Sequence, residues 1–197
     1  MSAKFSTTTA DRMDWDEAIN LTRKLYKDGN YRMAAFIACG IFTGLRVTDL
    51  RALCWADLMG DDVVSIIEHK TQKKRVIKLN KDFKQLIKDC YESLNITNPN
   101  QHIFLSQKKT VYSTQRLNVL LKAIKKKYHV HCKNFSNHTL RKTFGYRIFE
   151  MASEHGGQEM ALIKLSEIFG HSNTQVTRRY LGLKKEEMME AYDLLSF

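Results

Sequence analysis

Apolar and polar residues follow a helical period along most of the chain. Asp14, with Glu17 three residues later, has the pattern of a capped helix start, and apolar residues then recur until residues 28–30. Residues 31–42 are apolar almost throughout. The pattern therefore predicts one amphipathic helix from Asp14, and then a mostly buried helix that ends at the turn-forming Gly44.

The same period continues to the end of the chain, with one interruption. A short helix is expected over 47–53. Longer helical patterns cover 81–94, 113–128, 138–153, 159–169, 173–181 and 184–195.

The interruption has the pattern of a β-hairpin. Residues 63–67 form a β-branched run, and a second run covers 75–79 after the polar stretch 70–74. We therefore expect a mainly α protein with one small antiparallel β-sheet, an α+β fold whose hairpin has a basic tip. Pro99 is the one proline, and no Ser/Gly-rich linker occurs. We expect a lead segment over 1–13 and one domain over 14–197.

Composition excludes several classes of protein. The longest apolar run, 33–42, is far shorter than the roughly 20 residues that span a bilayer. The N-terminus lacks the apolar region of a secretory signal. Four scattered cysteines without a C-x-x-C pair indicate reduced, structural thiols. The formal charge of +11 favours a polyanionic partner, although a basic protein without such a partner has the same charge.

Three polar segments are candidates for chemistry. In the first, Thr43-Gly-Leu-Arg46, the turn at Gly44 places Arg46 at a helix start. Asp49 follows on the same helical face and is placed to orient the Arg46 guanidinium. A solvent-exposed Arg–Asp pair has the same spacing.

The second segment places His138 and Arg141 three residues apart on one helix. Both side chains project on one side while Leu140 turns inward. An arginine beside a histidine can hold a phosphate, because the guanidinium is always charged and binds two oxygens at once. A helix with a solvated polar face is the alternative.

The third segment contains Gly170-His171-Ser172, which ends one helix and begins another. Tyr180 follows His171 by nine residues, directly after Arg178 and Arg179. A tyrosine at such a position is usually part of a core. The two neighbouring arginines favour a tyrosine close to an anion.

A metal site is not expected. His129, His131, Cys132 and His138 are close together in sequence, but they match no usual zinc spacing.

Taken together, these segments resemble the catalytic domain of tyrosine recombinases, the phage-integrase family, and most closely integrases of conjugative and mobilisable elements. The resemblance extends from Asp14 to the end of the chain. The family's T-G-[LM]-R segment matches the residues ending at Arg46, and its H-x-L-R box matches His138 to Arg141. Its L-G-H-[ST] segment matches residues 169–172, with Phe169 in place of the leucine. Its nucleophile matches Tyr180, and its hairpin lysine matches Lys70, with Lys73 as second choice.

The resemblance implies a mechanism. Tyr180 would attack a DNA phosphate to give a 3′-phosphotyrosyl link and a free 5′-hydroxyl. Arg46, Arg141 and His171 would bind the phosphate oxygens, with Asp49 in support. His138 would act as acid/base or orient the site, and Lys70 would protonate the leaving oxygen. Flanking DNA would be contacted by Lys73, Lys74, Arg178 and Arg179.

The resemblance also implies the context of the reaction. No metal or other cofactor is expected, because the covalent link conserves the bond energy. The expected partner is double-stranded DNA at recombination sites, bound by a tetramer through exchange of C-terminal tails. We expect a cytoplasmic, nucleoid-associated bacterial protein, with the family's N-terminal core-binding domain absent. The alternatives are type IB topoisomerase-like DNA relaxation and a non-catalytic DNA-binding module, with a metal-dependent nuclease more remote.

Overall fold

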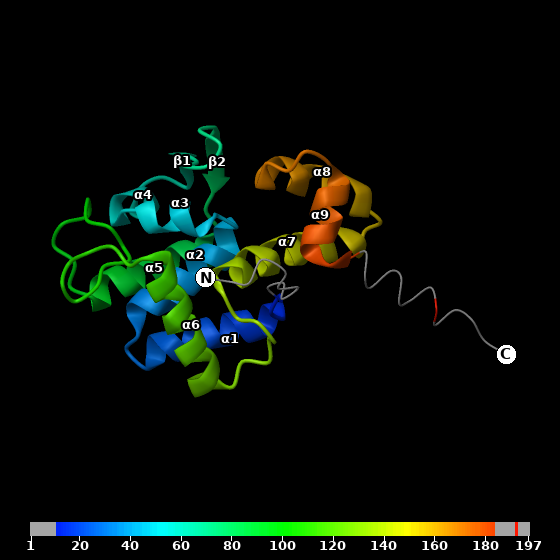
Figure 1. The fold of residues 1–197 in the computed structure, drawn as a ribbon. Helices are drawn as coiled ribbons and strands as arrows, with labels where there is room; N and C mark the ends of the chain where they lie inside the picture. The colour runs from blue at the N-terminus through cyan, green and yellow to red at the C-terminus, as the bar shows by residue number, and fades with distance from the viewer. Residues whose placement is uncertain (1–10, 184–191, 193–197) are drawn as a thin grey trace. The chain divides into compact units, whose positions relative to one another are not determined.

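The computed structural model describes residues 11–183 and residue 192, and it is mostly helical with one two-stranded sheet (Figure 1). Its helices are α1 Trp15–Lys27, α2 Tyr31–Thr43, α3 Val47–Ala52, α4 Trp55–Met59, α5 Lys81–Ser93, α6 Thr114–Tyr128, α7 Asn137–Ser153, α8 Gln158–Phe169 and α9 Thr174–Leu181. Its strands are β1 Val63–Ile67 and β2 Lys74–Lys78. The expected α+β fold is therefore confirmed.

The chain forms two compact units whose boundary lies within α7. Unit 1 extends to Phe144 and contains α1 to α6 and the sheet. Unit 2 begins at Gly145 and contains α8 and α9. Each unit contains part of the motif residues: Arg46 and Arg141 belong to unit 1, and His171 and Tyr180 belong to unit 2.

Helix α2 is the centre of unit 1. Every residue from Met33 to Ile41 is buried, and α2 packs against α1, α3 and α5 (Figure 1). Gly40 allows α7 to approach closely, because a Cβ at this position would lie 2.6 Å from the Cβ of Leu140. The buried helix that the sequence predicts is therefore the element around which unit 1 packs.

The ends of α1 and α2 have the expected caps. The Asp14 carboxylate accepts a hydrogen bond from the backbone N–H of Glu17 at 3.0 Å, as predicted for the first helix. Helix α2 ends at Gly44 in the left-handed conformation, with φ of 59°. A Cβ on Gly44 would also overlap the Phe144 ring, so both backbone conformation and packing require glycine here. The chain then turns directly into α3, whose N-cap is Arg46.

The hairpin pairs β1 with β2 in antiparallel register, so that Ile66 lies opposite Arg75 and Ile67 opposite Lys74. The predicted first strand is correct, and the second begins one residue earlier than expected. Residues 68–73 connect the strands, with Gln72 at a positive φ of 54°. The turn is closed by a hydrogen bond from the Glu68 N–H to the Lys73 carbonyl at 3.0 Å.

In unit 2, α7 packs closely against the end of α8 and against α9 at Gly145. A Cβ on Gly145 would lie 2.7 Å from the Phe169 ring and 2.9 Å from Leu181. Phe169, at the end of α8, is fully buried. Helix α8 ends at Gly170 in the left-handed conformation, and Asn173 caps α9 through a hydrogen bond from the Val176 N–H.

One helix was not expected from the sequence, and one expected helix lies outside the described residues. The five-residue helix α4 was not predicted, because fewer than two turns give no readable period. The predicted helix over 184–195 lies outside the described residues, apart from Tyr192.

Neither disulfides nor membrane-spanning helices occur in the described part of the chain. All four cysteines are free, and burial raises the pKa of Cys39 and Cys90. None of the described helices combines the length and apolar character needed to cross a lipid bilayer.

Candidate active site

The end of α2 at Thr43 and the α2–α3 loop, residues 44–46, gather arginines from three parts of unit 1. Arg46 ends the loop itself. Arg141 of α7 donates from Nη1 to the Gly44 carbonyl at 2.6 Å, and Arg75 of β2 donates from Nη2 to the Thr43 carbonyl. Arg141 is only 5% exposed. The structure therefore brings two predicted phosphate-binding residues, Arg46 and Arg141, to one short loop.

Glu68 is the carboxylate that neutralises part of this charge. Its Oε2 accepts from Arg46 Nη1 at 2.7 Å, and its Oε1 lies 3.4 Å from Arg75 Nη1. Thr71 donates to the same Oε2 at 2.8 Å. Burial alone would raise the pKa of Glu68, but the hydrogen bonds from Thr71 and Arg46 and the two positive charges outweigh it and lower the pKa. Glu68 is therefore held as a carboxylate.

Asp49 has a different contact from the one its spacing suggests. Its Oδ1 accepts a hydrogen bond from the His69 backbone N–H at 2.8 Å, which ties α3 to the hairpin turn. Its Oδ2 is buried without a hydrogen bond. The Arg46 guanidinium instead donates to the Glu68 carboxylate.

Sequence reasoning missed Glu68 and Arg75. The available signal was weak: a single acid directly after a β-branched strand, opposite a basic residue on the returning strand. Helical spacing favours pairs three or four residues apart, whereas Glu68 is 22 residues from Arg46 and reaches it only through the fold.

The lysines of the hairpin lie at its exposed end. Lys70 and Lys73 are in the connecting turn, and Lys74 is the first residue of β2. All three are exposed. Lys70 follows Glu68 by two residues, so it extends from the same turn that holds the carboxylate of the arginine cluster.

His138 and Arg141 lie one turn apart at the start of α7, as their spacing predicts. Arg141 is buried, whereas His138 is at the surface. Desolvation by neighbouring atoms lowers the pKa of His138, and the positive charges of Arg141 and Lys142 lower it further. The lowered pKa therefore favours the neutral imidazole of His138, the form that can accept a proton.

In unit 2, His171 and Tyr180 lie beside each other. The rings of Phe169, His171 and Tyr180 are mutually in contact, and each pair of centroids is 5.4 Å apart. His171 Nδ1 is 2.9 Å from the Thr177 hydroxyl, which in turn is 2.8 Å from the Ser166 hydroxyl. Sequence reasoning did not identify Thr177 or Ser166, because each has the spacing of an ordinary buried helix position.

Arg178 and Arg179 precede Tyr180 on α9. Arg178 is half-buried and Arg179 is exposed. Both are in the last turn of α9, where positive charge complements the helix dipole. Their position is thus consistent with helix stability as well as with contacts to an anion.

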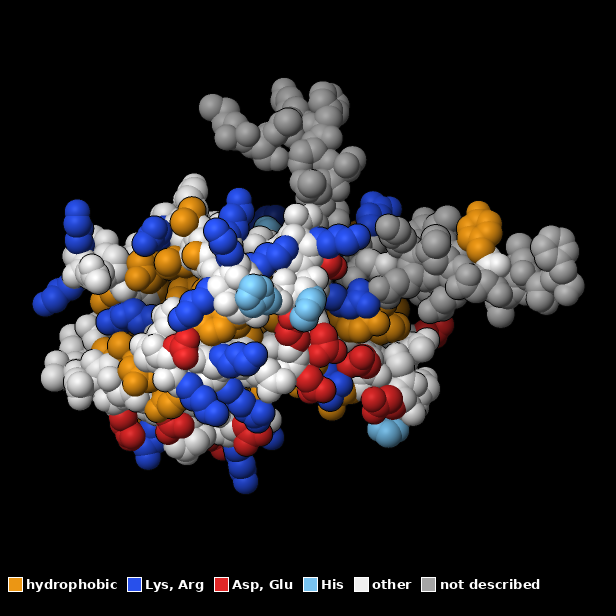
Figure 2. All heavy atoms as spheres, turned by 90° about the horizontal axis from the view of Figure 1, so that it is seen from below, with side chains coloured by type: hydrophobic (Ala, Val, Ile, Leu, Met, Phe, Trp, Pro, Cys, Tyr) orange, Lys and Arg blue, Asp and Glu red, His pale blue; other side chains and the backbone are white. Residues whose placement is uncertain are grey.

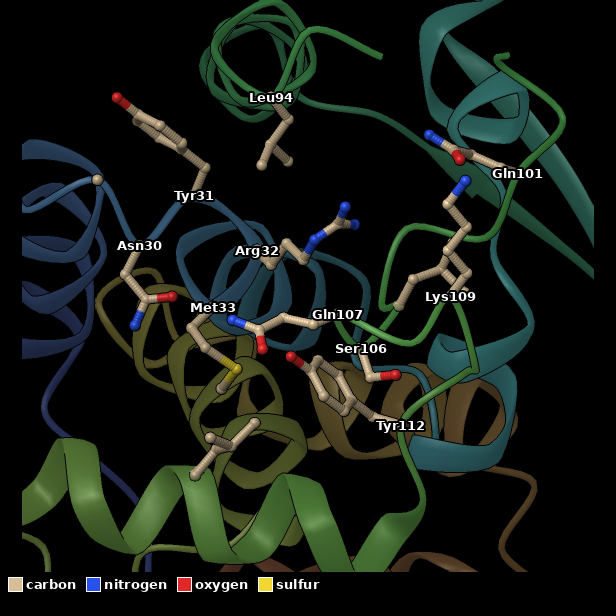
Figure 3. A pocket seen from close by; sticks show the side chains of 13 residues that line it. Asn30, Tyr31, Arg32, Met33, Leu94, Gln101, Ser106, Gln107, Lys109 and Tyr112 are labelled. Carbon is tan, nitrogen blue, oxygen red and sulfur yellow. The ribbon is translucent and has the colours of Figure 1, made fainter. Parts of the chain in front are cut away.

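A separate cavity of about 470 Å³ occurs in unit 1, between the start of α2, the loop over 101–112 and α6 (Figure 3). Arg32 and Lys109 line it together with hydroxyl and amide groups, and none of its described lining residues is acidic. Arg32 donates to the Ile103 carbonyl at 2.7 Å, and burial lowers the pKa of Arg32. The cavity shares no residue with the candidate catalytic set.

Positive charge is spread widely over the face shown in Figure 2, where Lys and Arg side chains are interspersed with smaller groups of acidic residues. Some of this charge has structural contacts. Lys127 Nζ pairs with the Asp28 carboxylate at 2.8 Å, and Lys125 Nζ donates to the Lys133 carbonyl at 2.7 Å. Net charge alone therefore does not locate an anion-binding surface.

Among the residues considered as metal ligands, His131 contacts a carboxylate and Cys132 lies in the interior. His131 Nδ1 pairs with Glu17 at 3.0 Å, and Cys132 is buried. Within residues 11–183 and at residue 192, no group of three or more His, Cys, Asp or Glu is arranged to hold a metal ion.

Comparison with known families gives a match over most of the chain. A family model described as "Phage integrase family" matches residues 12–187. That span includes every candidate catalytic residue in both units.

Individual relatives agree with this match. The probable integrase/recombinase YoeC of Bacillus subtilis (strain 168) is 28% identical over 180 residues, covering 89% of this chain and 91% of that protein. Tyrosine recombinase XerC of Leptospira interrogans serogroup Icterohaemorrhagiae serovar Lai (strain 56601) is 26% identical over 151 residues, covering 76% of this chain and 46% of XerC. The chain thus spans nearly all of one relative and about half of the other.

A solved structure shows the same fold. The Tn1549 transposon integrase in complex with transposon right end DNA superimposes with a TM-score of 0.71 at 18% identity. The match covers 94% of this chain and 67% of that one.

Proposed function

The chain belongs to the phage integrase family and is a tyrosine recombinase, and from this premise we propose that it cuts and rejoins DNA strands at specific sites through Tyr180. The observation that carries the assignment of residues is the hydrogen bond from Arg141 to the Gly44 carbonyl. It ties the second motif arginine to the loop that holds the first, as binding of one phosphate by two guanidinium groups requires.

The arginine cluster supplies the electrostatic part of the proposal. Arg46, Arg75 and Arg141 surround the loop, and Glu68 pairs with the first two. A scissile phosphate gains negative charge on its non-bridging oxygens during attack. Fixed, partly desolvated guanidinium groups stabilise that charge without reorganising. We assign Arg46 and Arg141 to the phosphate, and Glu68 and Arg75 to holding Arg46 in place.

The covalent step is assigned to Tyr180. Its Oη forms a bond to phosphorus while the bond between phosphorus and the 5′-oxygen breaks, giving a 3′-phosphotyrosyl link. We assign the phenolic proton to the imidazole of His138, whose lowered pKa favours the unprotonated form that can accept it. The leaving 5′-oxygen takes its proton from Lys70, or from Lys73 as second choice. Rejoining follows the same steps in reverse.

The partner in this proposal is double-stranded DNA. The support is the family and the solved Tn1549 integrase, which is in complex with transposon right end DNA. Lys73, Lys74, Arg178 and Arg179 are assigned to the flanking DNA backbone. Asp49 is assigned a supporting role, through the hairpin turn whose His69 N–H it binds.

The assembly and location are extensions of the same proposal. We propose a tetramer on DNA in which C-terminal tails are exchanged between protomers, and association with the bacterial nucleoid. The residues of that tail lie almost entirely outside the described part of the chain.

The alternatives are not favoured by the comparisons. The family match and the named relatives support recombination over DNA relaxation or simple DNA binding.

The test is capture of the covalent intermediate. A nicked duplex carrying an attachment site, selected from a random pool by binding to this protein, should form a covalent adduct in the presence of EDTA. Tyr180→Phe should abolish the adduct. Tyr146→Phe, at another half-buried tyrosine of unit 2, is the matched control and should form it. An adduct that persists in Tyr180→Phe would overturn the assignment of the nucleophile.

A further inference from the structure

A chain of hydrogen bonds leads from His171 into the interior of unit 2. His171 Nδ1 contacts the Thr177 hydroxyl at 2.9 Å, and Thr177 contacts the Ser166 hydroxyl at 2.8 Å. Ser166 then donates to the Leu162 carbonyl at 2.8 Å. Thr177 is fully buried and Ser166 is 7% exposed. The chain therefore connects α9 to α8 at a place where water does not compete for these groups.

The direction of every hydrogen bond in the chain follows from its inner end. A carbonyl oxygen only accepts, so the single hydroxyl proton of Ser166 is committed to Leu162. Ser166 must then accept from Thr177, which commits the single Thr177 proton. Thr177 can therefore only accept from His171, so Nδ1 of His171 carries a proton. The reverse direction would place two lone pairs against each other at 2.8 Å.

We infer that Ser166 and Thr177 are positioning residues that hold the neutral His171 ring as its Nδ1–H tautomer. The hydrogen bond made by one imidazole nitrogen decides the state of the other. With the proton fixed on Nδ1, Nε2 of the neutral ring carries a lone pair. It carries a proton only in the imidazolium form.

This inference rests on the proposed function only for its catalytic consequence. If His171 binds the scissile phosphate, Nε2 can donate a hydrogen bond to it only as the imidazolium. His171 would then contribute a positive charge together with the hydrogen bond, and charge-assisted hydrogen bonds are roughly twice as strong as neutral ones. A neutral histidine in the other tautomer would give the hydrogen bond alone.

Within unit 2, the rings of Tyr180 on α9 and Phe169 on α8 contact His171. Tyr180 is titratable and Phe169 is uncharged. Thr177 and Ser166 do not titrate in the accessible range. A change of tautomer after substitution of either hydroxyl residue therefore reports on the hydrogen-bond chain.

The test is nitrogen-15 NMR of the imidazole rings in the full chain without DNA, with the His171 signals assigned by their absence in His171→Gln. At a pH where the ring is neutral, we expect Nδ1 to be protonated and Nε2 unprotonated. A neutral ring protonated at Nε2 would overturn the inference. This measurement does not depend on catalysis, so it stands even if no covalent adduct forms.

Three variants test the two positions. Ser166→Ala frees the Thr177 proton to donate to Nδ1, so the ring should shift toward the Nε2–H tautomer although His171 and its direct partner are unchanged. Thr177→Val removes the hydroxyl that accepts from Nδ1, so the ring should again shift toward the Nε2–H tautomer. Thr177→Ser keeps the hydroxyl and should leave the tautomer as in the wild type. An unchanged His171 tautomer in Ser166→Ala, or a changed tautomer in Thr177→Ser, would refute the role of the hydrogen-bond chain. Ser166→Ala also keeps the test open if Thr177→Val does not fold.

A kinetic measurement separates positioning from general stability. In the wild type, adduct formation should lose the His171 contribution as the ring deprotonates. In Ser166→Ala the neutral ring can donate from Nε2, so the rate of adduct formation should fall less steeply with rising pH. A parallel reduction of the rate at every pH would indicate a structural role only and would contradict the catalytic consequence.

Discussion

The Arg141 guanidinium donates a hydrogen bond to the carbonyl of Gly44, two residues before Arg46, although Arg141 and Gly44 are 97 positions apart in the chain. This hydrogen bond holds the Arg141 guanidinium in place relative to the α2–α3 loop. It gives a structural reason why the two motifs act as one site, and it leads to the first prediction.

Arg141→Ala should reduce covalent-adduct formation by about 10²–10³-fold, the usual cost of removing one fixed donor to a transition-state oxyanion. DNA affinity should change little, because many other cations contact the backbone. Single-turnover cleavage and a binding titration measure the two effects. Arg23→Ala, at an exposed arginine of α1, is the control and should affect neither. Equal losses in binding and cleavage would mean that Arg141 only positions DNA.

Glu68→Gln should destabilise the fold by about 2 kcal/mol, because it leaves Arg46 and Arg75 without their carboxylate in a partly buried site. The effect should depend on pH. Since the pKa of folded Glu68 is below its unfolded value, ionised Glu68 adds stability above the usual glutamate range, and this is lost as pH falls through the folded pKa.

Urea unfolding at several pH values measures this contribution. The wild type should lose stability toward acid pH more steeply than Glu68→Gln, which has no group to protonate. Asp62→Asn removes an exposed partner of Lys84 and is the control, with little expected change. Identical pH dependence in wild type and Glu68→Gln would contradict the assigned role of Glu68.

Gly44→Ala should destabilise unit 1 by about 3 kcal/mol. About 1 kcal/mol comes from placing a Cβ at positive φ, and the rest from overlap with the Phe144 ring. Gly29→Ala isolates the first effect, because Gly29 also has positive φ, at 75°, but a Cβ there meets nothing within 4 Å. Equilibrium unfolding of both variants gives the difference. Equal losses would show that Phe144 moves aside without cost.

Lys73→Ala should weaken DNA binding and reduce its dependence on salt. If Lys73 contacts one backbone phosphate, the slope of log affinity against log salt should become shallower by about 0.9. Lys127→Ala is the matched control, since the Lys127 ammonium already pairs with Asp28 within the protein. Binding titrations from low to moderate salt measure the slope. The same change in both variants would mean that only net charge matters.

Sequence reasoning succeeded where local patterns decide the structure. The cap at Asp14, the turn at Gly44 and the hairpin from Val63 all follow from neighbouring residues, and all are confirmed. It missed α4 over 55–59, because this helix is too short to show a hydrophobic period. Burial of Trp55 in the core stabilises it instead. It also assigned the orientation of Arg46 to Asp49, the acid with helical spacing. In the structure, the hairpin places the Glu68 carboxylate against the Arg46 guanidinium.

The sequence by itself determined the family, the α+β fold class and the order of the candidate catalytic residues, because short motifs and hydrophobic periods are local properties of the chain. Only the tertiary structure decided which groups hold those residues. Arg75 and Glu68 meet Arg46 through the hairpin, and Ser166 and Thr177 meet His171 through the packing of α8 on α9. Hydrogen-bond direction and pairing of charge depend on distances between residues far apart in the chain, and those distances exist only once the core has formed.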